Sequence, residues 1–251
     1  MNPCHVPESG NPSVKAAAVR FLKRMTLTSA LSLTAALVFA QAAQGDIQEK
    51  IAAVKRSVAE NKQKLQQYRW VETTQLTLKG DVKPATQNMC QYGPGGTVQK
   101  TAMTPPPPSP SGGRLKERVI EHKTEEMQQY MSQVKVLLGM YVPPDPGKMD
   151  QAFKAGKVSL NPTAAGTNVV FADYAVPGDR MVLTFDPAAK KITSLNIDSY
   201  MGDAKDSVKL QVEMATLPGG TSYERQSVLS VSAKQLVVTT TNSDYQNLFG
   251  R

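Results

Sequence analysis

Few side chains in this 251-residue sequence are of the types that metal binding or nucleophilic catalysis requires. The chain has two histidines, His5 and His122, and two cysteines, Cys4 and Cys90. A multi-histidine metal site would need more histidines, and a thiol nucleophile would need Cys90 and His122 side by side. His122 stands among Lys and Glu residues in a stretch of helical periodicity, which indicates a solvent-facing position. We therefore expect no metal site and no cysteine–histidine catalysis.

Carboxylates are the other candidates for catalysis. Asp179, Asp186, Asp198 and Asp203 could in principle supply an acid pair, but each lies beside an expected turn. Aspartates at turns usually accept hydrogen bonds from the backbone of the turn itself. We therefore predict a protein that has no catalytic residues and no cofactor, and that is not an enzyme.

Residues 1–42 have the form of a secretory signal peptide. Basic residues up to Arg24 precede the apolar stretch Met25–Ala40, and small residues at cleavage spacing follow it. The apolar stretch is short and diluted by Thr and Ser, which disfavours a membrane-spanning helix. We expect export to the periplasm with cleavage near residues 40–42. An N-terminal anchor that is never cleaved is the alternative.

Export would leave Cys90 as the single cysteine of the mature chain, so that no disulfide could form within it. We expect this thiol to be buried and the protein to be a monomer, and an exposed thiol that links two chains is the alternative.

The formal charge is +8, but Lys and Arg are scattered among acids without a basic stripe. We therefore expect no nucleic-acid partner.

Hydrophobic residues make up 40% of the chain and charged residues 20%, which is typical of a globular protein. We expect residues 43–251 to form a single domain. It begins with a helix over 46–66, because Asp46–Glu49 matches a capping box and apolar residues recur at helical spacing. From Tyr68 the pattern changes to Thr, Val and aromatic residues, which predicts a strand that turns at Gly80-Asp81. Two further strands are expected, at 82–92 and 97–103.

The proline-rich segment 104–113 is expected to be an extended spacer loop, because four consecutive prolines cannot enter a sheet interior. The longest run of helical periodicity follows it, predicts a helix over residues 115–140 and stops before Pro143-Pro144. With a short helix at 147–156 it forms an inserted helical hairpin, 115–156. The remaining residues alternate between turns and strands, and 208–214 shows the clearest alternation of apolar and polar side chains. These patterns predict an α+β fold with an antiparallel sheet.

Three short motifs lie at the ends of expected elements: Tyr68-x-Trp70 after the first helix, Tyr92-x-Pro-Gly-Gly, and Phe185-Asp186-Pro187 between two strands. Together with the order of the elements, they resemble the LolA/LolB/RseB-like superfamily of periplasmic lipoprotein and lipid carriers. The resemblance implies an antiparallel sheet curved into an open half-barrel, with the N-terminal helix and the inserted hairpin covering its concave face. It also implies that this face binds the acyl chain of a lipid or lipoprotein.

The residues alone leave two possibilities for the concave face. If the helices fill it, the result is an ordinary core; if they leave it partly open, the result is an apolar cavity. Several methionines in the mature chain suit walls that adapt to varied chains. The candidate cavity residues are apolar and lie on the expected inner faces of the strands and of the long helix: Trp70, Leu76, Leu78, Met127, Met131, Leu183, Phe185, Leu195, Ile197, Leu210, Val212 and Met214.

Two functions follow from these possibilities. An open cavity predicts a non-enzymatic carrier whose partner is a hydrophobic small molecule or an acyl chain. A filled core predicts a module that docks to another protein of the cell envelope. We favour the carrier, and we expect residues 115–156 to act as a movable cover that swings on the proline spacer and Pro143-Pro144.

Overall fold

The computed structural model describes residues 45, 48–56, 58–105 and 114–250, and the signal-peptide expectation lies outside them. Their main element is an antiparallel sheet of 11 strands. Its strands are β1 (Tyr68–Leu78), β2 (Asp81–Val82), β3 (Thr86–Tyr92), β4 (Val98–Ala102), β5 (Val158–Thr163), β6 (Gly166–Ala172), β7 (Arg180–Asp186), β8 (Lys191–Met201), β9 (Asp203–Thr216), β10 (Ser222–Val231) and β11 (Leu236–Asn247). The helices are α2 (Arg114–Leu138), α3 (Pro146–Lys154) and an N-terminal helix comprising residues 48–56 and 58–65.

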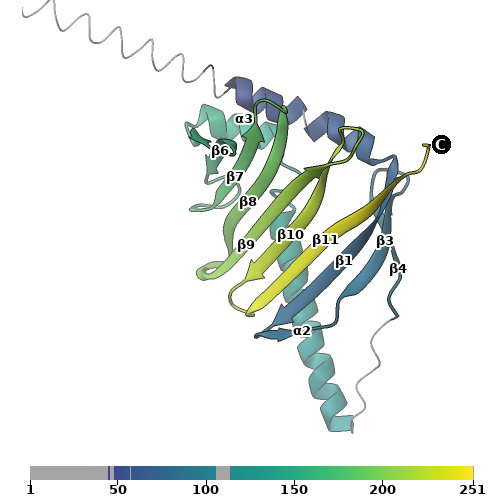
Figure 1. Ribbon diagram of the computed structural model, residues 1–251. Helices are drawn as coiled ribbons and strands as arrows, with labels where there is room; N and C mark the ends of the chain where they lie inside the picture. Colours follow the sequence, from purple (N-terminus) through teal and green to yellow (C-terminus); the bar gives the residue numbers. More distant parts are fainter. Residues whose placement is uncertain (1–44, 46–47, 57, 106–113, 251) are drawn as a thin grey trace, which may run out of the picture. The chain divides into compact units, whose positions relative to one another are not determined.

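The strand order is β4-β3-β1-β11-β10-β9-β8-β7-β6-β5, with β2 paired to β1 alone. Strands β5 to β11 therefore follow one another as hairpins, and β1 joins this series by pairing with β11 from Tyr68↔Asn247 to Leu78↔Leu236. The sheet is not closed, because β4 and β5 are its two edges. Figure 1 shows the strands side by side with the N-terminal helix across one end.

Side-chain alternation explains why the sheet has one buried face. On β9, Val208, Leu210 and Val212 are buried, while Lys209 and Gln211 between them are exposed. Successive side chains of a strand point to opposite faces, so an alternating sequence gives one apolar face and one wet face. The expected strand at 208–214 is confirmed, and the buried side is the inner face of the sheet.

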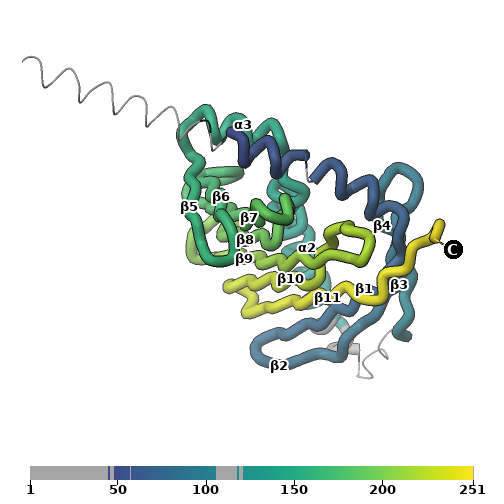
Figure 2. Tube along the Cα trace, turned by 45° about the horizontal axis from the view of Figure 1, so that its top comes forward, coloured from purple at the N-terminus to yellow at the C-terminus, as the bar shows by residue number. Residues whose placement is uncertain are grey.

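The helices cover this inner face. In Figure 1, α2 passes behind the sheet, and Figure 2 shows the N-terminal helix running across the strand ends. Val134 and Leu137 near the end of α2, Tyr141 after it, and Met149 of α3 are buried in the same core cluster as the inner-face residues of β6 to β9. The expected α+β fold, an open curved antiparallel sheet covered by an N-terminal helix and an inserted helical hairpin, is confirmed.

Local sequence signals account for the start of α3. Asp145 is the N-cap of α3, since its Oδ1 accepts a hydrogen bond from the backbone N–H of Lys148 at 2.9 Å, and Pro146 follows at the first helical position. The edge strand β5 was not predicted. It contains Pro162, a residue that an edge strand accepts but that weakens the strand signal in the local pattern.

A buried carboxylate fixes the hairpin to the sheet. Asp179 is 3% exposed and accepts hydrogen bonds from the hydroxyl of Tyr141 at 2.5 Å and from the backbone N–H groups of Tyr174, Ala175 and Val176 at 2.5, 2.8 and 2.7 Å. The Tyr141 hydroxyl also lies 2.9 Å from Ser199 Oγ on β8. Burial and then the hydrogen bond to Asp179 raise the pKa of Tyr141, which keeps the phenol protonated.

This anchor contradicts the expectation that residues 115–156 swing as a movable cover. Opening the hairpin would expose Tyr141, Val134 and Met149, each at most 1% exposed, and would leave the buried Asp179 carboxylate short of a partner. The sequence showed the amphipathic helix and the flanking prolines but not the tyrosine–aspartate contact across the fold. The end of α2, Tyr141 and α3 are therefore part of the core, which disfavours a hairpin that swings as a unit.

Within the described residues, none of the helices is both long enough and apolar enough to cross a membrane.

Candidate functional site

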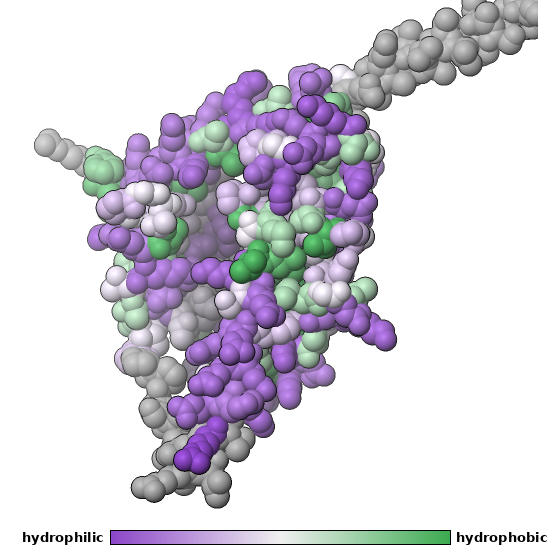
Figure 3. Space-filling view, turned by 180° about the vertical axis from the view of Figure 1, so that it is seen from behind, coloured by the Kyte–Doolittle hydropathy of each residue, from purple (hydrophilic) through white to green (hydrophobic). Residues whose placement is uncertain are grey.

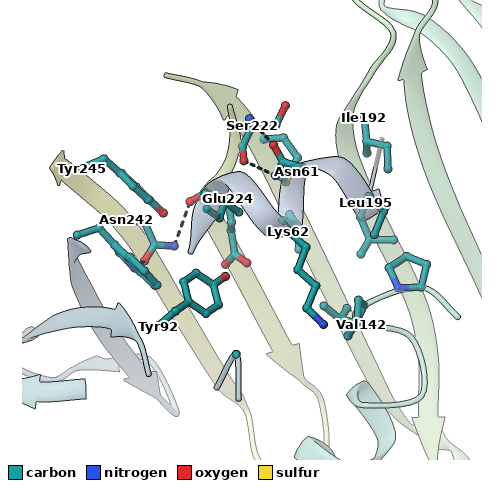
Figure 4. A pocket seen from close by; sticks show the side chains of 18 of the residues that line it. Asn61, Lys62, Tyr92, Val142, Ile192, Leu195, Ser222, Glu224, Asn242 and Tyr245 are labelled. Atoms are coloured by element: carbon teal, nitrogen blue, oxygen red, sulfur yellow. Dashed lines mark hydrogen bonds between the residues drawn. The ribbon is translucent and has the colours of Figure 1, made fainter. Parts of the chain in front are cut away.

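A cavity of about 500 Å³ lies on the inner face of the sheet. Its walls are strands of the sheet, and its cover consists of helical residues 58–65 and the loop Val142–Pro144 (Figure 4). A hollow also opens on this side of the molecule in Figure 3. The lining residues are Val58, Asn61, Lys62, Leu65, Trp70, Glu72, Tyr92, Gly96, Val142, Pro143, Pro144, Leu183, Ile192, Leu195, Val212, Met214, Ser222, Glu224, Asn242 and Tyr245.

One wall of the cavity is apolar and comes from β7, β8 and β9. Leu183 pairs with Leu195 across β7 and β8, and Leu195 pairs with Val212 across β8 and β9. Directly paired residues point to the same face of an antiparallel sheet, so these three side chains form a continuous row. Ile192 on β8 and Met214 on β9 also line the cavity and extend the apolar wall.

The opposite wall is aromatic and comes from β1, β3 and β11. The rings of Trp70 on β1 and Tyr245 on β11 stack, with centroids 5.5 Å apart and an interplanar angle of 7°. The ring centroid of Tyr92 on β3 lies 5.5 Å from that of Trp70. Tyr223 packs against Tyr245 at 4.4 Å but does not line the cavity. The four aromatic rings thus pack against one another, and Trp70, Tyr92 and Tyr245 line the cavity.

Polar groups hold the aromatic wall in place. Asn242 is 8% exposed; its Oδ1 accepts a hydrogen bond from Trp70 Nε1 at 3.0 Å, and its Nδ2 donates to the backbone carbonyl of Glu224 at 3.0 Å.

Burial, followed by the negative charge of Glu224, raises the pKa of both Tyr92 and Tyr245. Both phenols therefore remain neutral at physiological pH.

Two carboxylates line the cavity, and they differ in their partners. Glu72 on β1 accepts hydrogen bonds from Lys100 Nζ at 2.6 Å through both oxygens, which neutralises its charge. Glu224 on β10 is half-buried, and its carboxylate makes no hydrogen bond or ion pair within the part of the chain that the structure describes. In Figure 4 the hydroxyl of Tyr92 points toward Glu224.

Asn61 fastens the helical cover to the sheet. Its Nδ2 donates to the backbone carbonyl of Ser222 at 2.5 Å, and its Oδ1 accepts from the backbone N–H of Ser222 at 2.7 Å. Ser222 begins β10 and is 8% exposed, so its backbone groups have little access to water. One side chain makes both bonds, so Asn61 ties this part of the helix to the start of β10.

Replacing Asn61 by alanine should loosen this cover. Two hydrogen bonds of about 1 kcal/mol each are lost, so opening of the helix should become at least about tenfold more frequent. Amide hydrogen exchange in helical residues 58–65 should accelerate while exchange in β7 to β9 stays unchanged. Gln63→Ala on the exposed side of the same helix is the matched control. Equal exchange in the two variants would show that Asn61 does not hold the cover.

Five of the twelve residues predicted for the ligand site line this cavity: Trp70, Leu183, Leu195, Val212 and Met214. The structure places the other seven in the core cluster or packed against it, and not on the cavity wall: Leu76, Leu78, Met127, Met131, Phe185, Ile197 and Leu210. The physical reason is that helical side chains fill this part of the concavity: Met127 and Met131 belong to α2 itself, and the core cluster around the other five also contains residues of the N-terminal helix and α3.

The polar and covering residues of the cavity were missed. Glu224, Asn242 and Tyr245 are separated from Trp70 by more than 150 residues in the sequence and meet it only because β1 pairs with β11. Asn61 and Lys62 belong to the expected N-terminal helix, but the sequence did not indicate which part of the sheet the helix covers. The signal that could have indicated the aromatic wall was the close spacing of aromatic residues at Tyr68 and Trp70 and again at Tyr245 and Phe249.

Within the described ranges of the chain, no hydrogen bond or ion pair joins any two of the residues considered for catalysis. His122 is exposed on α2 beside Glu126 at 3.4 Å, and Cys90 is buried on β3. Asp186 and Asp203 accept hydrogen bonds from the backbone of their own turns, as expected. Among the described residues, no group of His, Cys, Asp and Glu side chains is placed to hold a metal ion. The geometry of the cavity is suited to binding.

Cys90 should be unreactive in the native protein. Its side chain is fully buried, and burial followed by the charge of Glu72 raises the pKa of the thiol, although Lys100 opposes this shift. Since the thiolate is the reactive form, an aromatic disulfide reagent should label Cys90 at neutral pH only after unfolding. The native protein should also run as a monomer on a non-reducing gel. Rapid labelling of the folded protein would contradict the buried position.

Comparisons with known proteins give a similarity of fold. No family model matches the chain, and no curated protein matches its sequence. Among solved structures, a DUF1329 family protein from Desulfovibrio piger is 7% identical with a TM-score of 0.41, covering 82% of this chain and 94% of that chain. A LolA superfamily protein from Nitrosomonas europaea is 9% identical with a TM-score of 0.28, covering 77% of this chain and 93% of that chain. Both similarities concern the fold alone.

Proposed function

We propose that this protein binds the alkyl or acyl chain of a lipid or lipoprotein in the cavity under its N-terminal helix, without chemical conversion. The observation that supports this most directly is the space of about 500 Å³ left open against the apolar row Leu183, Leu195 and Val212. Sites for small molecules typically measure about 300–1,000 Å³ and are lined mainly by apolar and aromatic side chains. The cavity agrees with both criteria.

The energetics favour long chains. Each methylene group that moves from water into the cavity contributes about 0.8 kcal/mol. Association and ordering of the ligand cost several kcal/mol, so about eight to ten methylenes are needed before binding becomes tight. The protein should therefore distinguish ligands by chain length before it distinguishes them by head group.

A titration with a neutral fluorescent probe that carries a long alkyl chain tests the proposal. We expect one probe per protein chain, displaced by dodecanol and not by butanol. Native mass spectrometry of the purified protein should in addition detect a co-purified lipid. If the folded protein bound neither the probe nor dodecanol, the carrier function would be wrong and docking to an envelope protein would be the better hypothesis.

We also propose that the chain acts after export to the periplasm, since residues 1–42 have the order of a signal peptide: basic, apolar, then small residues. N-terminal sequencing of protein from the periplasmic fraction should find a start near residue 41 or 43. Protein that retains Met1 and sediments with membranes would contradict export with cleavage.

A further inference from the structure

The aromatic wall and Glu224 together form a distinct end of the cavity, which we call the aromatic end: Trp70, Tyr92, Tyr245 and Glu224. We propose that this end binds the positively charged ammonium head group of the ligand, while the alkyl chain lies along the apolar wall. The inference rests on the proposed function and adds the chemical class of the ligand, a cationic amphiphile. It follows from the rings, from the unpaired carboxylate and from the positions of the other charges.

The rings provide the first argument. Trp70, Tyr92 and Tyr245 line the cavity from three different strands and are fixed by ring contacts of 5.5 Å between centroids. The face of an aromatic ring carries partial negative charge and attracts a cation, and quaternary ammonium groups are bound by such groups of rings. An ammonium group surrounded by methyl or methylene groups also gains from apolar contact with the rings.

The carboxylate of Glu224 provides the second argument. It lines the cavity beside these rings, and after burial its negative charge is the next cause of the raised pKa of Tyr92 and Tyr245. Unlike Glu72, which is paired with Lys100, it has no partner among the described residues. A half-buried carboxylate without a partner is unfavourable, so a cation that enters the cavity gains a charge-assisted contact at this point.

The remaining charge of the cavity lies elsewhere. In Figure 4 the side chain of Lys62 leaves the helix toward Val142, on the side of the cavity away from Tyr245. The Lys100 ammonium is bound to Glu72. The aromatic end is therefore negative without compensation, and it should repel an anionic head group such as a fatty-acid carboxylate that reaches it.

Competition with ligands of one chain length and different head groups tests this inference. Dodecyltrimethylammonium, dodecanol and dodecanoate should each displace the neutral fluorescent probe at concentrations below micelle formation. We expect the cation to bind about tenfold more tightly than the alcohol, and the anion more weakly than the alcohol. Equal affinity for the cation and the alcohol would overturn the assignment of the head-group site.

The variant Glu224→Gln separates charge from shape. It should reduce the preference for the cation over the alcohol to about threefold or less, because the loss of the charge weakens binding of the cation more than binding of dodecanol. Glu213→Gln, at an exposed carboxylate on β9 that contacts Arg225, is the matched control and should keep the full preference. A full preference retained by Glu224→Gln would also overturn the inference. If the wild-type protein bound dodecanol and not the cation, only the head-group site would be wrong; if it bound neither, the proposed carrier function would fail with it.

Discussion

Replacing Asp179 by alanine should lower the free energy of unfolding by about 3–5 kcal/mol. The carboxylate is buried and accepts hydrogen bonds from the Tyr141 hydroxyl and from three consecutive backbone N–H groups, at 174–176. Without it, these four donors remain in the interior without an acceptor, and each such group costs about 1–3 kcal/mol if the fold does not rearrange. Urea unfolding followed by circular dichroism measures the loss.

Two further variants show whether the effect arises from this contact. Tyr141→Phe removes one donor and leaves Asp179 bound to the backbone, so it should cost only about 1–2 kcal/mol. Asp198→Ala removes an exposed carboxylate that pairs with Lys209 at the surface, and should change the stability by less than about 1 kcal/mol. If all three variants lost the same free energy, the anchor between hairpin and sheet would not have the importance given to it.

Filling the cavity should weaken binding of the alkyl chain. Met214 is half-buried on β9 and lines the cavity, so Met214→Trp would place a larger ring in the open space. The affinity for the neutral alkyl probe should fall at least about tenfold, since the loss of two buried methylene positions alone costs about 1.6 kcal/mol. The thermal unfolding temperature should change little, because the added ring occupies a cavity and not a packed core.

Gln211→Trp introduces the same ring on the opposite, exposed face of β9 and is the control. It should bind the probe as the wild-type protein does. Should the two tryptophan variants bind equally well, the ligand would occupy another surface, and the cavity would have no part in binding.

The fold could be predicted from the sequence where a pattern is local. Alternation over 208–214 fixed both the strand and its buried face, and the long helical period predicted α2 to within two residues. The prolines and glycines marked most of the turns. Strand β5 was not predicted, because Pro162 and the polar residues around it have the composition of a loop, although an edge strand accepts them.

The site could be predicted only in part, because it depends on pairings across the chain. Every predicted ligand residue was apolar and lay on an inner face, and this criterion does not separate a cavity wall from a filled core. Leu195 lines the cavity, whereas Ile197, two residues further along the same face, is covered by the core cluster. The difference is set by where α2 and the N-terminal helix lie, which the local pattern of β8 does not contain.

Because β1 pairs with β11, the order in which the sheet assembles is also constrained. Each pair from β5 to β11 joins neighbours in the sequence, whereas Leu78 must find Leu236 across most of the chain. Closing so long a loop costs entropy, and non-local strand pairs form slowly. Strands β5 to β11 should therefore form first, and the aromatic wall, which needs β1 and β3 docked on β11, should form last. A chain emerging from synthesis or translocation would acquire its binding capacity only at the final step of folding.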